Sequence, residues 1–298
     1  MKQATLSSSE LILNKDGSIY HLNLKPSDIA ETIITVGDPN RVEAVSKYFD
    51  TIEVAIQKRE FKTHTGTFKG KRLSVISTGI GTDNIDIVLN ELDALVNIDF
   101  KARTVRKALK QLTLIRIGTS GAIQPDITVD SFLISETAIG FDNLLHFYGN
   151  NDIFDLAFSE AFTKHTNWNA NNSTPYVVSA NAALVQQFAS EAFTKGCTAT
   201  NVGFYGPQGR VLRLQTQDDH LNDKLASFQF QNKKITNLEM ETSGMYALAT
   251  LLGHRAISLN AILANRANKT FSEQSHETID RLIKKTLSII TTPEFSEQ

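Results

Sequence analysis

Cysteine is almost absent from this chain of 298 residues, and Cys197 alone cannot form an internal disulfide. We interpret Cys197 as a buried small residue rather than a nucleophile. No apolar run reaches the roughly 18 residues of a membrane-spanning helix, and residues 1–17 lack the apolar stretch of a signal peptide. The seven histidines show no metal-ligand spacing. We therefore expect a cytoplasmic protein without a metal site.

An excess of charge is also missing, because 30 basic side chains face 32 acidic ones and leave a net charge of −2. Such a balance gives no indication of a nucleic-acid or membrane partner. Hydrophobic residues make up 41% of the chain and charged residues 21%, which argues against disorder. The basic stretch 97–110 is a local exception. We interpret it as a solvated helix or loop, with a docking role as the alternative.

The chain contains no internal repeat, no low-complexity tract and no linker rich in Pro, Gly or Ser. Its length would allow one large α/β domain or two smaller ones. Without a linker we favour a single domain over residues 21–298, preceded by an N-terminal extension over residues 1–20.

Short β-branched or apolar runs alternate with amphipathic stretches from residue 31 onward, which is typical of strands and covering helices in an α/β sheet. The predicted strands lie near 32–36, 72–77, 114–117, 131–136, 175–179, 235–238 and 256–263. The predicted helices lie at 39–48, 83–96, 152–165, 181–194, 241–253 and 274–291.

A glycine turn follows the first predicted strand, where residues 33–36 lead into Gly37-Asp38-Pro39-Asn40-Arg41. Pro39 suits the first turn of a helix, and the N-terminus of a helix attracts anions through its free N–H groups and its dipole. Arg41, one turn into that helix, could add a bidentate contact. The segment predicts an anion site, although a plain structural turn would have the same sequence.

Two further stretches of small residues, 77–82 and 118–122, are predicted as turns after strands. Ligands in open α/β sheets bind at the carboxyl ends of strands, where all three turns are expected to lie. Arg116 stands inside an apolar strand and is costly to bury without an anion or an acidic partner. A bound anion and a structural salt bridge are both open explanations for it.

Neither a Walker lysine loop nor a G-x-G-x-x-G fingerprint is present, which removes most support for nucleotide hydrolysis and dinucleotide redox chemistry. A series of other motifs occurs instead: HLNL from His21, GDPNRV from Gly37, REF from Arg59, STGIG from Ser77, RIGTSGAIQP from Arg116, FYGPQGR from Phe204 and EME from Glu239. In this order, from about residue 21 to about residue 266, they resemble the nucleoside phosphorylase-I superfamily, also called the PNP/UDP family.

This resemblance implies a three-layer α/β/α fold with a central mixed, partly barrel-like sheet. It also implies an enzyme that cleaves nucleosides with inorganic phosphate as co-substrate and with no cofactor. The implied phosphate ligands are Gly37, Arg41, Arg59, Arg116 and Thr119. Arg59 would come from a neighbouring subunit, so a homo-oligomer with shared sites is expected, either a dimer or a trimer of dimers. Guanidinium groups around the dianion would position it for in-line attack.

The ribose site implied by the resemblance consists of His21, Thr119, Met240 and Glu241. Glu241 would accept hydrogen bonds from the 2′- and 3′-hydroxyls, and His21 of the other subunit would meet the 5′-hydroxyl. Taken without the resemblance, Glu241 could equally be a charge at a helix N-terminus, and Met240 a core residue.

The base pocket implied by the resemblance consists of Phe204, Gln208, Arg210 and Arg266, in a segment similar to that of the uridine phosphorylases. Phe204 would stack on the base, Gln208 and Arg210 would bind the uracil edge, and Arg266 would support the loop. Arg210 would stabilise negative charge on the leaving base. Without the resemblance, a Gly/Pro surface loop would explain this stretch. The implied catalytic residues are therefore Arg116, Glu241 and Arg210.

Purine or broad-specificity phosphorolysis is the main alternative, but members that cleave purines have an aspartate where this chain has Leu263-Ala264-Asn265-Arg266. A nucleoside-binding protein without turnover is less expected, since all the phosphate arginines are present. A monovalent cation binds at the dimer interface of bacterial relatives, near residues that match Glu60, Ile80 and a serine. Asn84 replaces that serine, which puts the cation in doubt.

Overall fold

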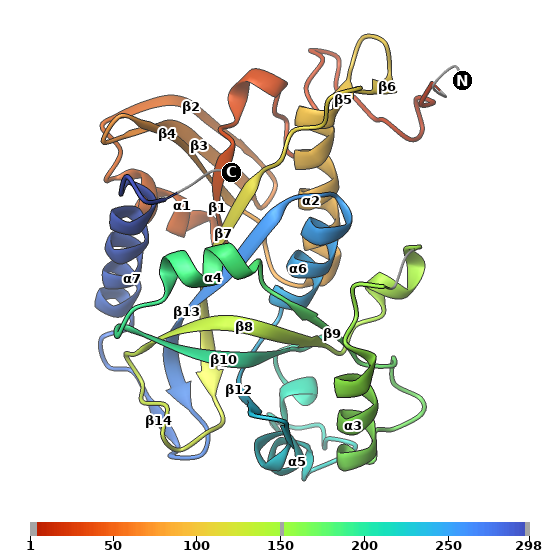
Figure 1. The fold of residues 1–298 in the computed structure, drawn as a ribbon, viewed down its shortest axis with the longest axis vertical. Helices are drawn as coiled ribbons and strands as arrows, with labels where there is room; N and C mark the ends of the chain where they lie inside the picture. Colours follow the sequence, from red (N-terminus) through yellow and green to blue (C-terminus); the bar gives the residue numbers. More distant parts are fainter. Residues whose placement is uncertain (1–4, 150–151, 296–298) are drawn as a thin grey trace.

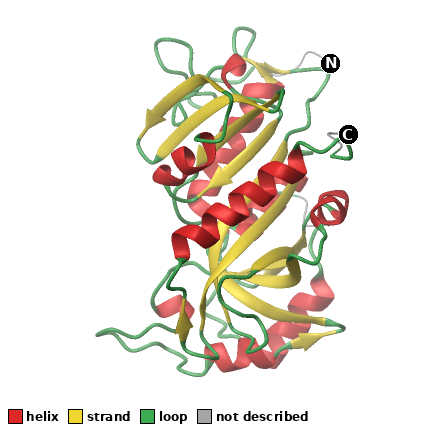
Figure 2. Cartoon of the chain, turned by 90° about the vertical axis from the view of Figure 1, so that its left-hand side faces the viewer, coloured by secondary structure: helices red, strands yellow, loops and turns green. Residues whose placement is uncertain are grey.

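A computed structural model describes residues 5–149 and 152–295 of the chain. One large mixed sheet forms its centre, with helices on both sides (Figure 1). The long C-terminal helix α7 runs across the front of Figure 2. Among the described residues, no helix is long and apolar enough to cross a membrane.

The strands have the following bounds. They are β1 Thr32–Val36, β2 Thr51–Lys58, β3 Phe61–Phe68, β4 Lys71–Ser77, β5 Ile98–Asp99, β6 Thr104–Val105, β7 Thr113–Ala122, β8 Phe132–Gly140, β9 Tyr176–Ser179, β10 Phe193–Thr200, β11 Gln229–Phe230, β12 Lys233–Glu239, β13 Arg255–Asn265 and β14 Thr270–Phe271. The α-helices are α1 Pro39–Ser46, α2 Thr82–Asn97, α3 Leu156–Thr166, α4 Ala182–Phe188, α5 Leu221–Ser227, α6 Thr242–Leu251 and α7 Ser275–Ile290. Three short 3₁₀ helices lie at Pro26–Asp28, Leu144–Phe147 and Gly206–Gln208.

The main sheet is partly closed, as the resemblance implied. Its strand order is β11-β12-β10-β8-β13-β7-β1-β4-β3-β2, with β9 on β8 and β14 on β13. A further antiparallel pairing of β12 with β7, at Leu238 opposite Gly121, joins two strands that are otherwise far apart in this order. Five strands therefore form a ring, and β1 to β4 extend from it as an open wing. The α/β class and the partly barrel-like sheet are confirmed.

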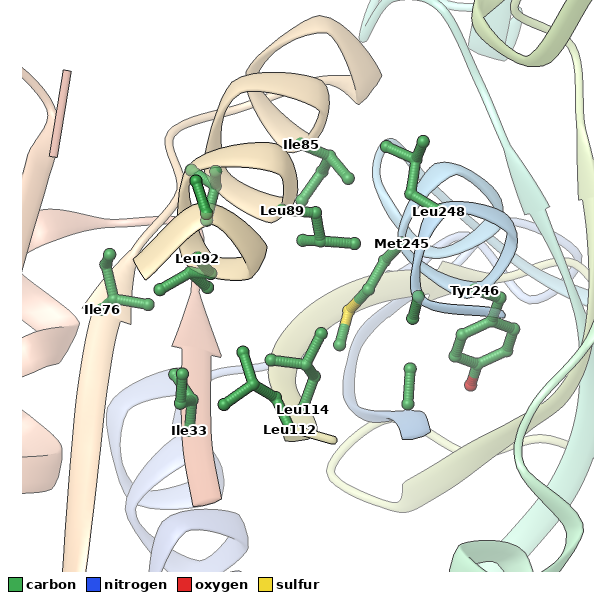
Figure 3. Close-up of a cluster of buried hydrophobic side chains, with 14 of the residues drawn as sticks. Ile33, Ile76, Ile85, Leu89, Leu92, Leu112, Leu114, Met245, Tyr246 and Leu248 are labelled. Atoms are coloured by element: carbon green, nitrogen blue, oxygen red, sulfur yellow. The ribbon is translucent and has the colours of Figure 1, made fainter. Parts of the chain in front are cut away.

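Two apolar clusters pack on opposite sides of the wing. On one side Ile85 and Leu89 of α2 meet Met245 and Leu248 of α6 above the strand residue Leu114 (Figure 3). On the other side, α1, α4 and α7 supply the buried residues Val42, Val45, Leu184, Phe188, Leu282, Ile283 and Leu287. These helices show the apolar periodicity that the sequence predicted. Burial of their apolar faces fixes the ends of β1 and β4 and the middle of β7, where the candidate site lies.

All seven predicted strands are present, but the sequence missed β2, β3 and β10 as well as the two-residue strands β5, β6, β11 and β14. Strand β2 is mostly exposed and carries Lys, Glu and Gln, so it lacks a clear apolar face. Residues 181–194 were predicted as one helix, and this prediction was wrong. Helix α4 ends at Phe188, because Ala189 is extended with φ −60° and ψ 122°, and β10 begins at Phe193.

The predicted turn at residues 118–122 was also wrong, because these residues continue β7. Gly121 and Ala122 pair with β12 on one edge and with β13 on the other, so the backbone stays extended. The basic stretch 97–110 forms the small β5–β6 hairpin followed by loop. Within it, Arg103 donates hydrogen bonds to the carbonyls of Leu6, Ser7 and Leu11, which hold the N-terminal segment.

Candidate active site

The turn between β1 and α1 has the predicted geometry. Asp38 caps the helix by accepting a hydrogen bond from the Asn40 N–H at 2.9 Å, and Pro39 occupies the first turn. Gly37 lies between strand and cap, and Arg41 reaches across to the Ile117 carbonyl of β7 at 3.4 Å. Burial lowers the pKa of Arg41, and the nearby charge of Arg116 adds to this effect. The turn and β7 thus bring two guanidinium groups together.

Arg116 is buried, with 5% of its surface exposed, and it has acidic partners. Its Nη2 donates to Glu241 Oε2 and lies 3.3 Å from Glu239 Oε2. Its Nη1 donates to Ser258 Oγ at 3.3 Å. Burial acts against the charged form, but the two carboxylates outweigh it and raise the pKa of Arg116. A salt bridge therefore holds Arg116 in place.

Gly118 makes room for this guanidinium. A Cβ atom at Gly118 would lie 1.8 Å from Nη1 of Arg116, because the guanidinium lies over this glycine two residues further along β7. The small residues after Arg116 were predicted to allow close approach of a ligand, and here one of them allows close approach of the arginine. Thr119, the next residue of β7, is half-buried and lies opposite Ala261 of β13.

The EME motif links β12 to α6 and places two carboxylates beside Arg116. Glu239 accepts hydrogen bonds from Thr200 Oγ1 at 2.7 Å and from the backbone N–H groups of Glu241 and Thr242, both at 2.9 Å, and so binds two N–H groups at the start of α6. Met240 is half-buried between the two glutamates.

Glu241 Oε1 accepts a hydrogen bond from the N–H of Gly81, which belongs to the predicted turn at residues 77–82, at 2.9 Å. Burial raises the pKa of Glu241, Arg116 opposes the rise, and Glu239 adds to it. The two arginines, Arg41 and Arg116, and the two glutamates balance in formal charge. A dianion would therefore enter a site whose own charges are matched.

The base loop is held by contacts among its own residues. Arg210 Nη1 donates to Gln208 Oε1 at 2.6 Å and to the Phe204 carbonyl at 2.5 Å. The guanidinium also stacks over the Phe204 ring, with Cζ 3.6 Å from the ring centroid. Gln208 is buried, whereas 51% of the Phe204 surface is exposed. The structure thus brings three of the four predicted base-binding residues together.

Arg266 adds a second guanidinium near the loop. Burial lowers its pKa to about 10, and the charge of Arg210 contributes to this shift. Its backbone N–H binds the Ala122 carbonyl at 2.9 Å. Within the described residues, the buried Nε and Nη2 atoms of Arg266 have no hydrogen-bond partner. These donors are available to a ligand or to water.

A family model described as the phosphorylase superfamily matches residues 31–292. The chain belongs to the phosphorylase superfamily. The match covers every element of the main sheet and every predicted site residue except His21.

Relatives in the superfamily cover most of the chain. A uridine phosphorylase from Thermococcus kodakarensis is 30% identical over 272 residues, which make up 89% of this chain and 84% of the relative. A DeoD-type purine nucleoside phosphorylase from Listeria monocytogenes is 26% identical over 266 residues, with 88% and 95% covered. A solved nucleoside phosphorylase from Trypanosoma brucei, described as showing uridine phosphorylase activity, has a TM-score of 0.85 and 30% identity, with 94% of this chain and 98% of that chain covered.

Two predicted site residues of this superfamily member lie apart from the others. Arg59 is exposed in the β2–β3 turn with φ 54°, and His21 binds Glu91 of α2. Among the described residues, no hydrogen bond or ion pair joins either side chain to Arg116 or Glu241. They are neighbours of each other, however, because Lys58, which precedes Arg59, donates to the carbonyl of Tyr20 at 2.5 Å. One surface therefore carries both residues.

The residues that match the family's interface cation site gather around Gly79. A Cβ atom there would lie 3.0 Å from Glu60 Cγ and 2.4 Å from Asn84 Nδ2. The same amide nitrogen donates to the Ile80 carbonyl at 3.3 Å. Hard cations require oxygen ligands, and here an N–H donor already engages that carbonyl oxygen. Asn84 therefore presents an N–H group to this carbonyl, where a serine in bacterial relatives would offer an oxygen.

The sequence did not reveal a cavity of about 1260 Å³ that borders Gly81, Asn201 and Pro207. Asn201 is 2% exposed, and its Oδ1 has no partner among the described residues. Asp142, also on the cavity wall, accepts hydrogen bonds from Tyr176 Oη at 2.7 Å and from the Leu144 N–H at 3.0 Å, and burial raises its pKa. Asn201 directly follows β10. A correct prediction of that strand from the sequence would therefore have indicated Asn201 as a candidate site residue at a strand end.

Proposed function

We propose that this chain catalyses the reversible phosphorolysis of uridine to uracil and α-D-ribose 1-phosphate. The observation that carries the proposal is the convergence of Arg41, Arg116 and Glu241 at the strand ends, beside a loop in which Arg210 binds Gln208. The uridine phosphorylase from Thermococcus and the Trypanosoma enzyme support this choice of base.

Phosphate would bind between the Gly37 turn, Arg41, Arg116 and Thr119. Its oxygen attacks the anomeric carbon while the bond from this carbon to the base nitrogen breaks, and the electron pair of that bond leaves with the base. The protein needs no covalent nucleophile for this step. Positioning of the dianion by guanidinium groups in a buried site supplies orientation and electrostatic stabilisation. Arg59 of a neighbouring subunit would supply a third guanidinium.

Ribose would lie against Met240, with its 2′- and 3′-hydroxyls donating to Glu241. Both carboxylate oxygens of Glu241 already accept one hydrogen bond, from Gly81 and from Arg116. Each oxygen has a second lone pair, so the sugar can bind without breaking these contacts. Glu241 would thus fix the sugar relative to the phosphate.

Uracil would stack on Phe204 and present its edge to Gln208 and Arg210. The charge that develops on the leaving ring would be stabilised by Arg210, with Arg266 behind it. The stacked guanidinium of Arg210 occupies one face of the Phe204 ring. Uracil would therefore stack on the other face, or displace the guanidinium from the first.

Purine phosphorolysis is less well supported by the residues at the end of β13. Asn265, in the segment where purine-cleaving members have an aspartate, donates to the carbonyls of Gln124 at 2.8 Å and Ile127 at 2.6 Å. Its amide therefore holds the backbone together and offers no acid for a purine ring. Because the Listeria relative is a purine nucleoside phosphorylase, a purine nucleoside should still be tested as a substrate.

We further propose a cytoplasmic homo-oligomer, a dimer or a trimer of dimers, that acts in pyrimidine nucleoside salvage. The basis is the single surface that carries His21 and Arg59, since both are predicted to complete a neighbour's site. Inorganic phosphate is the co-substrate, and no cofactor is proposed.

The experiment is base release from uridine, deoxyuridine, thymidine and inosine, each with and without phosphate, followed by chromatography. Phosphate-dependent uracil release is the expected result. Release of hypoxanthine from inosine without release of any pyrimidine would contradict the assignment of the base loop.

A further inference from the structure

Three donors converge on the carboxylate of Glu91, a residue of α2 that the proposed mechanism does not use. The His21 N–H lies 3.0 Å from each Glu91 oxygen, and the Leu22 N–H donates to Oε2 at 2.8 Å. The third contact joins Nδ1 of the His21 ring to Oε1 at 2.7 Å. Glu91 thus holds both the backbone and the ring of His21.

The contact at Nδ1 determines which ring nitrogen carries the proton. An ionised carboxylate can only accept hydrogen bonds, so Nδ1 must donate to Glu91. A neutral imidazole then has an unprotonated Nε2, which is a hydrogen-bond acceptor. The structure shows no partner for Nε2 among the described residues, and 26% of the His21 side chain is exposed.

Neighbouring groups restrict the ring further. The Tyr20 ring meets it edge to face, with centroids 4.7 Å apart. Lys58 holds Tyr20 in turn, by donating to the Tyr20 carbonyl and lying over its ring at 4.7 Å from the centroid. The His21 ring therefore has one orientation, and its Nε2 edge is the part left for a ligand.

We propose that Glu91 is a positioning residue for the nucleoside: it fixes the His21 ring so that Nε2 accepts a hydrogen bond from the sugar 5′-hydroxyl. This inference rests on the proposed function, in which His21 serves the ribose of a neighbouring site. The substrates that benefit are nucleosides with a free 5′-hydroxyl. Gly81, the N-cap of the same helix, binds Glu241, so α2 of each subunit would support one sugar contact in its own site through Glu241 and one in the neighbouring site through His21.

The test compares uridine with 5′-deoxyuridine, which lacks only that hydroxyl, in the wild type, Glu91→Gln, His21→Ala and the double variant. Loss of one neutral hydrogen bond corresponds to about threefold to tenfold in kcat/KM. Glu91→Gln should raise the KM for uridine by about that factor and leave 5′-deoxyuridine cleavage unchanged. The double variant should be no worse than His21→Ala. Glu31→Gln, at an exposed carboxylate paired with Lys110, is the matched control.

Equal losses on both substrates, or additive losses in the double variant, would overturn the proposal, because a purely structural role of Glu91 lowers both activities alike. A wild type that releases no uracil would instead overturn the proposed function. In that case ¹⁵N NMR of the imidazole nitrogens still decides the inference. The proposal requires protonation at Nδ1 in the wild type and a changed pattern in Glu91→Gln, and a ring protonated only at Nε2 in the wild type would refute it.

Discussion

Arg116 and Arg210 are both predicted to meet charge on the substrate, yet they lie in contrasting surroundings. Arg116 lies within β7, buried among two carboxylates and the hydroxyl of Ser258 on β13. Arg210 donates its hydrogen bonds within its own loop, which contains the 3₁₀ turn Gly206–Gln208. A buried ion pair tolerates little change because an unpaired charge there is costly. A self-contained loop can exchange its internal contacts for contacts to a ligand.

Arg116→Ala should give the largest effect, since it removes a phosphate ligand and leaves Glu239 and Glu241 buried together. We expect phosphate-dependent turnover to fall by about 10³-fold and the free energy of unfolding by about 3–5 kcal/mol. Urea denaturation and uracil release measure the two quantities. A stable and fully active variant would show that Arg116 serves neither the site nor the fold.

Arg210→Ala should separate activity from stability. Loss of the stabilising charge should lower kcat/KM for uridine by about 10²-fold, while the free energy of unfolding changes by about 0.5 kcal/mol or less. Arg213→Ala, at an exposed arginine of the same loop, is the control and should change neither. An unfolded Arg210 variant would place this arginine in the scaffold rather than in the site.

Gly118→Ala should disturb the Arg116 end without removing any charge. The new Cβ would meet Nη1 of Arg116, so the guanidinium must shift, at an expected cost of about 1–3 kcal/mol. The KM for phosphate should rise in the same variant. Gly149→Ala, where a Cβ meets nothing within 4 Å, should behave as the wild type. Equal behaviour of the two variants would refute the tight packing around Arg116.

The ion cluster around the half-buried Asp280 at the surface gives the smallest predicted effect. Asp280 accepts hydrogen bonds from Lys47 and Tyr48 and pairs with Lys284 at 2.9 Å. Despite partial burial, these contacts lower the pKa of Asp280. A lowered folded-state pKa stabilises the protein above the unfolded value, near pH 4, and this contribution is lost as the pH falls through the folded-state value.

Asp280→Asn should therefore lower the Tm slightly at pH 7, with a cost of about 1 kcal/mol or less. The difference in Tm between this variant and the wild type should narrow as the pH falls below about 4. Thermal unfolding monitored at several pH values measures it. A gap that widens in acid would mean that the carboxylate gains no stability from its cationic neighbours.

The contrast between the two regions also explains what the sequence could predict. The turn at Gly37 and the placement of Glu241 before α6 follow from local rules for strands, caps and helix starts, and both are confirmed. For the buried Arg116, the sequence left a bound anion and an acidic partner open. The identity of that partner, Glu241, depends on contacts between β7 and the start of α6, which are distant in sequence.

Other features could not be predicted, for physical reasons. Strand β10 reads FTKGCTAT, with few large apolar residues, and is defined by its parallel partners β8 and β12. The extension of β7 beyond Gly118 depends on pairing with β12 at one edge and with β13 at the other. The secondary-structure propensities of residues 118–122 alone cannot predict this pairing. The ligands of Arg59 and His21 lie outside the single chain in the proposed oligomer, so their roles stay predictions.

The central claim is that phosphate, and not water, cleaves the nucleoside at the Arg41–Arg116 site. The most direct measurement is ³¹P NMR of a reaction with uridine and phosphate, with uracil release followed in the same sample. We predict one ribose 1-phosphate for each uracil, and no uracil when phosphate is left out. Uracil released at the same rate without phosphate, together with free ribose, would contradict the account.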